Sequence, residues 1–84
     1  MKLTHNTNYK VIAQGGVLFF ISNEKLKAEI EAVGFTNVQV TGIGTNRTAT
    51  GHWPLATQEK EFPKVVSSVI KSIEAVWFYN LNTD

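Results

Sequence analysis

The 84 residues of the chain carry eight basic against seven acidic side chains and no cysteine, so we expect one domain without disulfides, thiolate metal sites or cysteine nucleophiles. The basic residues are spread along the sequence rather than clustered, which argues against nucleic acid as a partner. The polar start lacks the apolar core of a signal peptide and the longest apolar run is too short to cross a membrane, so we expect a soluble cytoplasmic protein without a membrane partner.

The first predicted element is extended structure over residues 9–22. Residues 9–14 alternate in polarity, and residues 17–21 form a continuous β-branched and aromatic run that is typical of a central strand. Between these parts, Gly15 and Gly16 are compatible with either a tight hairpin turn or a bulge in one long strand. Residues 1–8 are polar, and we expect a flexible N-terminal segment there.

A helix is predicted next, because Ser22 and Asn23 are candidate N-caps for a segment running to about Val33. Its apolar residues recur every three or four positions and form one stripe: Leu26, Ile30, Val33. Gly34 is expected to end the helix in the left-handed conformation, with Phe35 folding back beside the cap.

Residues 35–43 and 45–55 are predicted to form a β-hairpin around the turn at residues 42–46. The first stretch alternates in polarity, and the turn contains two glycines. Pro54 marks the end of the second strand, since proline cannot donate to a ladder. Residues 57–61 are a polar connection.

A second helix is predicted from apolar residues spaced by three and four: Phe62, Val65, Val66, Val69, Ile70, Ile73. Residues 73–80 fit either a continuation of this helix or a strand. The run at residues 76–79 is β-branched and aromatic, which favours the strand. Residues 81–84 are expected to be a C-terminal tail.

The order strand, helix, two-stranded hairpin, helix, strand is that of a ferredoxin-like β-α-β-β-α-β sandwich. The expected fold class is therefore α+β, with one antiparallel sheet backed by two helices in a single domain over residues 9–80. Many unrelated functions share this arrangement, so it does not by itself assign an activity.

The sequence contains few residues with catalytic potential. His5 and His52 are its only histidines, and no aspartate precedes Asp84, so neither a Ser-His-Asp set nor a helical metal pair can be assembled. We expect no enzyme, no catalytic or metal-binding residue and no cofactor. Beside the two glycines of the hairpin turn, Arg47 is a candidate anion contact, although the turn itself requires those glycines.

The hairpin is the least charged part of the sequence. Between Glu31 and Glu59 the only charged residue is Arg47, whereas exposed sheet edges usually carry charges that discourage pairing with a second chain. Thr48 and Thr50 are therefore candidates for an outward binding surface. A solvated threonine face explains them equally well.

Aromatic residues give a second indication of a binding surface. The chain has five phenylalanines, two tryptophans and two tyrosines, which a small core does not easily bury. Because successive strand residues face opposite sides, Trp77 and Tyr79 in the core would turn Phe78 outward. Phe78 and Trp53 are therefore candidate partner contacts, and His52, next to Trp53, is a candidate ligand contact.

The leading functional hypothesis is a non-enzymatic protein-binding or assembly module that acts through a sheet edge or face. Its partner would be another protein or a second copy, as in a small accessory or structural subunit of a larger, for example viral, assembly. The alternative is a small dimeric ligand-binding domain or enzyme with a pocket lined by Arg47, His52, Trp53 and Tyr79.

Overall fold

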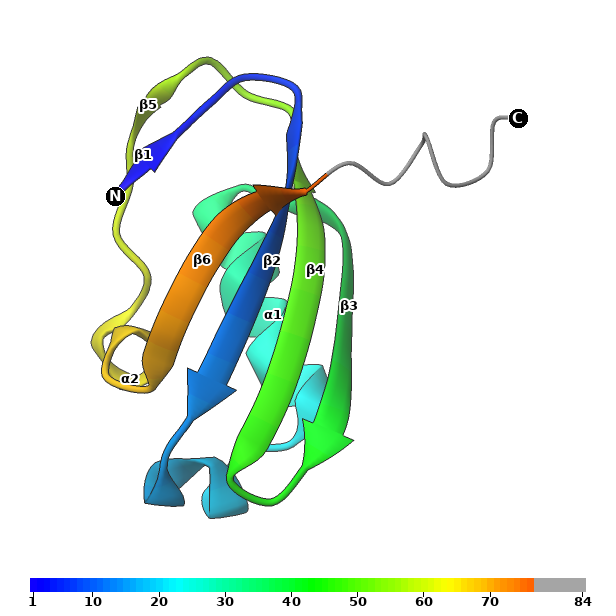
Figure 1. The fold of residues 1–84 in the computed structure, drawn as a ribbon, viewed down its shortest axis with the longest axis vertical. Helices are drawn as coiled ribbons and strands as arrows, with labels where there is room; N and C mark the ends of the chain where they lie inside the picture. The colour runs from blue at the N-terminus through cyan, green and yellow to red at the C-terminus, as the bar shows by residue number, and fades with distance from the viewer. Residues whose placement is uncertain (77–84) are drawn as a thin grey trace.

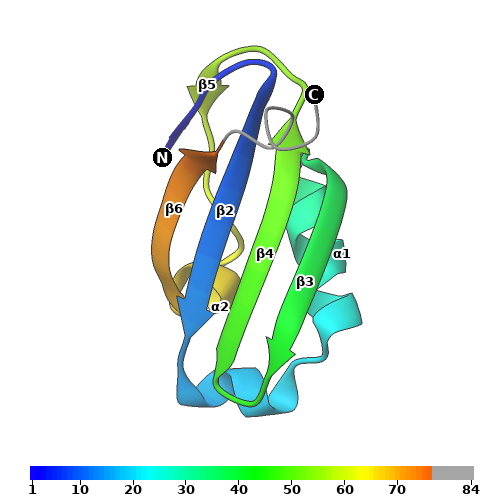
Figure 2. The same ribbon diagram turned by 45° about the vertical axis from the view of Figure 1, so that its right-hand side comes forward.

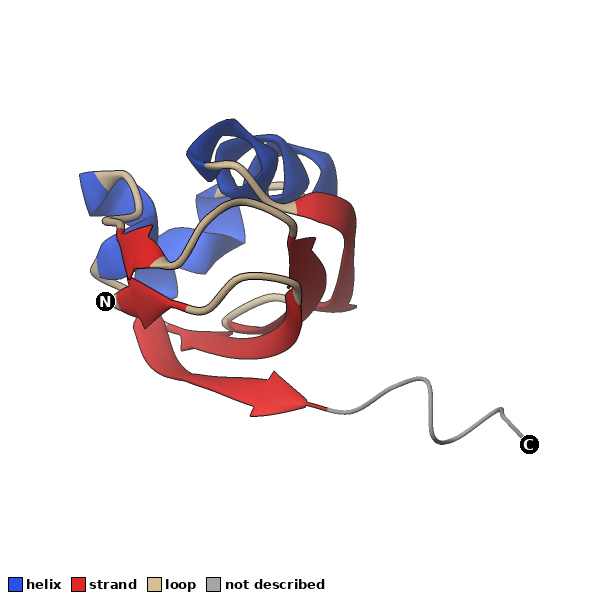
Figure 3. Ribbon diagram, turned by 90° about the horizontal axis from the view of Figure 1, so that it is seen from above, coloured by secondary structure: helices blue, strands red, loops and turns tan. Residues whose placement is uncertain are grey.

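The main layer of the molecule is a four-stranded antiparallel sheet with helices over one face (Figures 1 and 3). The computed structural model describes residues 1–76, in which the sheet has the order β3-β4-β2-β6. Its strands are β2 (Thr7–Gln14), β3 (Thr36–Ile43), β4 (Asn46–Trp53) and β6 (Ile70–Val76). The helices are the 3-10 helix η1 (Gly16–Phe20), α1 (Asn23–Val33) and α2 (Lys64–Ser67). The prediction of an α+β fold with an antiparallel sheet and helices is confirmed.

A second sheet, which the sequence does not predict, contains β1 (Lys2–Leu3) and β5 (Gln58–Glu59). The segment 1–8, expected to be flexible, thus includes β1 and the start of β2. Leu3 has only 1% of its surface exposed, so this short strand contributes to the core. The Met1 ammonium lies 3.1 Å from Glu59 Oε1, and hydrogen bonding to that carboxylate raises the pKa of the Met1 amino group.

Residues 17–21 do not form the central strand that their composition predicts. The chain leaves the sheet after Gln14 and turns into η1, where Leu18 is buried while Phe19 and Phe20 are exposed. Gly15 is therefore neither a hairpin turn nor a bulge. A Cβ atom at this position would lie 2.9 Å from Val69 Cγ1, so a glycine is needed where the chain passes this close to Val69.

The predictions for α1 are confirmed at both ends. Ser22 Oγ accepts a hydrogen bond of 3.0 Å from the backbone N–H of Lys25, which caps the first turn. Gly34 has a φ of 132° and its N–H donates to Glu31 O, which ends the helix. The predicted apolar stripe is buried, so α1 is held on the sheet by burial of its three largest apolar side chains: Leu26, Ile30, Val33.

The predicted hairpin is confirmed as β3 and β4, which meet at the Ile43–Asn46 pair. β4 ends at Trp53, immediately before Pro54, as expected for a residue that cannot donate to the ladder. β4 also pairs along its whole length with β2, so it is an inner strand. Among the described residues, β3 is consequently one edge of the main sheet.

The prediction of a long second helix is wrong. α2 is a single turn, and Ile70 and Ile73 belong to β6, which pairs with β2. The segment is rich in β-branched residues, which favour strands, and β2 gains a second partner when it pairs with them. The strand interpretation is confirmed for residues 73–76, and residues 77–80 lie outside the described part of the chain.

The core lies between the main sheet and the helices. Its centre is a cluster of aromatic rings in which Phe35 contacts Trp53, at 5.1 Å between ring centroids, and Tyr9 and Phe62 at 6.1 and 6.0 Å. Trp53 is fully buried and comes from the end of β4. One face of β4 is therefore committed to the core, and only its other face is open to a ligand or partner.

Candidate functional site

The alternation of side chains along β4 divides the predicted site residues between two faces of the sheet. Arg47 and Trp53 are buried on the core face. Thr48, Thr50 and His52 are half-buried on the opposite face, hereafter the open face. The sequence predicts this alternation, but the two sets do not form a common site because the sheet lies between them.

Arg47 is a structural residue rather than an anion contact. Its Nη1 donates to Ile21 O at 2.8 Å and to Asn23 Oδ1 at 3.0 Å, and its Nη2 donates to Leu18 O at 2.8 Å. These bonds fasten η1 and the start of α1 to β4. Only 8% of Arg47 is exposed, and its Nε is buried without a hydrogen-bond partner, so the guanidinium lies in the core rather than at the surface of the turn.

Trp53 is likewise unavailable to a partner. It has no exposed surface, and its Nε1 donates to Ala56 O at 3.1 Å. Phe78 and Tyr79, the other aromatic candidates, lie outside the described residues.

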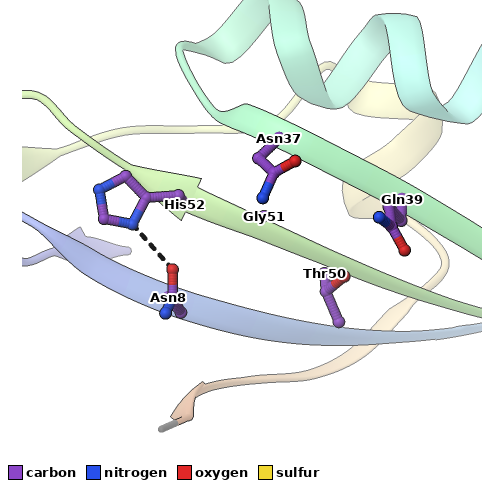
Figure 4. A pocket seen from close by; sticks show the side chains of 6 residues that line it. All are labelled: Asn8, Asn37, Gln39, Thr50, Gly51 and His52. Atoms are coloured by element: carbon purple, nitrogen blue, oxygen red, sulfur yellow. Dashed lines mark hydrogen bonds between the residues drawn. The ribbon is translucent and has the colours of Figure 1, made fainter. Parts of the chain in front are cut away.

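His52 lies in a shallow polar hollow of ≈ 250 Å³ on the open face (Figure 4). Its Nδ1 is hydrogen-bonded to Asn8 Oδ1 at 2.8 Å, across the β2–β4 pair. The hollow is lined by amide, hydroxyl, imidazole and backbone groups: Asn8, Asn37, Gln39, Thr50, Gly51, His52. Of the predicted pocket residues that the structure describes, Arg47, His52 and Trp53, only His52 lines this hollow. Among the described residues that line the hollow, none is a lysine, arginine or carboxylate.

The β3 edge presents a different kind of surface. Within residues 1–76, β3 pairs only with β4, and none of its residues is charged (Figure 2). The carbonyl oxygen of Gly42 accepts a hydrogen bond of 3.2 Å from Asn23 Nδ2 of α1, which indicates that it is directed away from β4. Because backbone groups alternate along a strand, Val40 also directs its N–H and C=O outward, whereas the register shift between Thr36 and Gln39 interrupts this alternation nearer the start of β3.

A groove of ≈ 340 Å³ runs beside this edge, between β3 and α1. Both strand and helix contribute its lining: Asn23, Glu24, Lys27, Val38, Gln39, Val40, Thr41. Val38 is buried and Val40 half-buried, so they form an apolar floor below two exposed, oppositely charged helix residues, Glu24 and Lys27. We call β3 and this groove the β3 edge site.

The sequence predicts the uncharged hairpin, and the structure places the two candidate threonines on its inner strand. Thr48 and Thr50, chosen as outward residues, lie on the inner strand β4, opposite Thr41 and Gln39 of β3. They therefore contribute to the open face and not to the edge. The lack of charge in residues 36–43 is the signal that identifies β3.

The opposite edge differs in charge. β6 is the edge strand on the other side of β2 within the described residues, and it carries exposed Lys71 and Glu74. Charges on an edge strand disfavour pairing with a second chain because they must be desolvated. This contrast makes β3 the better candidate for adding a strand.

At one end of the molecule η1 lies beside the β3–β4 turn (Figure 1), where the Gly15 N–H donates to Thr45 O at 3.0 Å. Exposed apolar side chains of these two segments form a small patch. Phe20 and Ile43 are 89% and 86% exposed, and Phe19 is 69% exposed. The Phe19 ring comes within 3.9 Å of the position of a Cβ at Gly44, so the patch connects η1 to the turn. The sequence does not predict this patch because residues 17–21 resemble a buried strand.

No match was found in comparisons with models of known protein families, with curated proteins or with solved structures. Over residues 1–76, no helix combines the length and apolar character needed to cross a membrane. The same residues contain no group of three or more histidine, cysteine, aspartate or glutamate side chains arranged to hold a metal ion.

Proposed function

We propose that this chain is a non-enzymatic protein-binding module that adds a strand of another chain to the edge of β3. The observation that carries the proposal is an uncharged edge strand with an apolar-floored groove beside it. Strand addition uses main-chain hydrogen bonds for affinity and side-chain pockets for specificity, and the β3 edge site offers both. A role as a small accessory or structural subunit is consistent with this mode of binding.

The direction of the β3 backbone groups supports the proposal. The outward N–H and C=O groups of Val40 make no backbone hydrogen bond outside the strand ladders of the described residues. An added strand would pair with these groups. Every second side chain of that strand would point toward the core side of the sheet and enter the groove above Val38 and Val40.

The proposal also takes the main sheet as the ferredoxin-like β-α-β-β-α-β arrangement. The order β3-β4-β2-β6 supports this assignment, with β2 and β4 inside and β3 and β6 at the edges. In that arrangement the first hairpin strand is an edge strand. The edge role of β3 is then a property of the topology.

A ligand-binding or enzymatic function has weaker support. The hollow beside His52 favours a small polar ligand through its amide and hydroxyl groups. However, Arg47 and Trp53 are buried on the other face, so the residues expected to define such a pocket do not converge.

Two lysine substitutions at equivalent positions test the proposal. Thr41 on β3 and Ser72 on β6 are exposed and lie at opposite ends of one cross-strand row, through Thr48 and Ile12. Thr41→Lys should abolish capture of protein partners from an extract of the native host by the tagged chain, because a lysine on the pairing edge opposes strand addition. The Ser72→Lys chain should still capture these partners.

Circular dichroism of both variants provides the folding control. Retention of the same partners by both folded variants, or loss of them from both, would refute binding through β3. Amide hydrogen exchange gives a second measurement, since partner binding should slow exchange at Val40.

A further inference from the structure

We infer that the strand added to β3 is β3 of a second copy of this chain, related by a two-fold axis. This inference rests on the proposed function and names the partner of the same edge. It depends on the distribution of charge in the β3 edge site, which is complementary to itself. Four strands of each copy would then form one continuous antiparallel sheet.

The charges of the groove are reciprocal. Glu24 and Lys27 are one helical turn apart, both line the groove and both are exposed. Within residues 1–76 neither makes an ion pair, whereas Lys25 and Glu29 of the same helix are joined at 2.9 Å. A two-fold axis beside the groove runs the two α1 helices antiparallel, so Glu24 of each copy lies beside Lys27 of the other.

The strand itself is also compatible with its own copy. In antiparallel pairing the outward backbone groups of Val40 find partners on the second β3. The open-face side chains that meet across the junction are Gln39 and Thr41, and neither is charged. Like charges opposite each other, which would destabilise such pairing, are therefore absent among the residues of β3.

Engineered cysteines report this geometry directly, because the natural chain contains none. Directly opposed residues between the hydrogen-bonded pairs of an antiparallel ladder have Cα atoms about 4.5 Å apart, within the range that a disulfide spans. Gln39→Cys, Thr41→Cys and an equimolar mixture of the two cover the registers in which these side chains meet. Ser72→Cys, exposed on β6, is the matched control for random oxidation.

In at least one of these three samples, we expect disulfide-linked dimer to form about tenfold faster than in Ser72→Cys, as measured on non-reducing gels under mild oxidation. Equal rates in all samples would overturn the inference. The open face is solvated at all three positions, so differences in folding do not enter the comparison.

Charge reversal at Glu24 and Lys27 distinguishes pairing with a second copy from pairing with an unrelated protein. In sedimentation experiments, Glu24→Lys or Lys27→Glu alone should raise the dimer dissociation constant about tenfold, because both reciprocal pairs become repulsive. The double variant restores both pairs with the charges exchanged, and its dissociation constant should return to within about threefold of that of the natural chain. Glu29→Lys, which changes a charge outside the groove, is the control and should have little effect.

A natural chain that stays monomeric at every concentration, or a double variant that stays as weak as the single variants, would overturn self-pairing. Neither result would refute the proposed function, since Thr41→Lys could still release a different protein from β3. Retention of host partners by Thr41→Lys would instead refute the proposed function itself.

Discussion

The two faces of β4 show how neighbouring residues of one strand acquire different roles. On the core face, Arg47 donates three hydrogen bonds and Trp53 is fully buried. On the open face, Thr48, Thr50 and His52 are half-buried, and His52 makes a single side-chain bond to its cross-strand neighbour. Arg47 and Trp53 therefore hold the fold together, and the two threonines and His52 form the accessible surface of the strand.

Among substitutions on the two faces of β4, the largest loss of folding stability is expected at Trp53. Trp53→Ala removes a fully buried ring that contacts Phe35 and should destabilise the fold by about 3–5 kcal/mol, as measured by urea denaturation. A loss below about 1 kcal/mol would contradict the assignment of this residue to the core.

Arg47→Met should have the next largest effect, about 2–3 kcal/mol, because the carbonyl of Ile21 loses its donor and the carbonyl of Leu18 keeps only the backbone N–H of Ile21. Arg47→Lys should recover only part of this loss, since one ammonium does not reproduce the planar fork. Urea denaturation of both variants provides the measurement. Full stability of Arg47→Lys would show that charge, rather than the three bonds, is what Arg47 supplies.

Gly34→Val tests the packing between the end of α1 and the core-face residue Trp53. Gly34 has a φ of 132°, and a Cβ there would lie 2.9 Å from Leu55 Cδ1 and 3.0 Å from Trp53 Cζ3. We expect a destabilisation of about 2 kcal/mol, visible as a lower denaturation midpoint. Gly16→Ala is the control, because a Cβ at Gly16 meets no atom within 4 Å. An equal response of both variants would exclude a special role for Gly34.

The smallest effect is expected on the open face. Thr48→Lys combined with Thr50→Lys should change stability by less than about 1 kcal/mol, because both side chains lie on the solvated side of an inner strand. Cross-linking through Gln39→Cys or Thr41→Cys should persist in this background. Loss of the cross-link with an unchanged thermal transition would instead place the interface on the open face.

The sequence predicts the hairpin as the region of interest but not which of its strands is exposed. Low charge between Glu31 and Glu59 is visible in the sequence, and it coincides with the β3 edge. The inner position of β4 depends on its pairing with β2, such as Lys10 with Thr50, between residues far apart in the chain. No local pattern in the hairpin reports that pairing, so the sequence does not distinguish the inner-strand residues Thr48 and Thr50 from the edge-strand residues Gln39 and Thr41.

The sequence alone determines the elements whose signals are local. The capping residue Ser22, the apolar stripe of α1 and the stop at Gly34 all act within a few residues, as do the turn and proline that bound the hairpin. Tertiary structure decides the apolar segments that fit more than one conformation. Residues 17–20 became η1 and residues 70–73 joined β6, because their apolar side chains could be buried in either form and contacts with distant strands selected one.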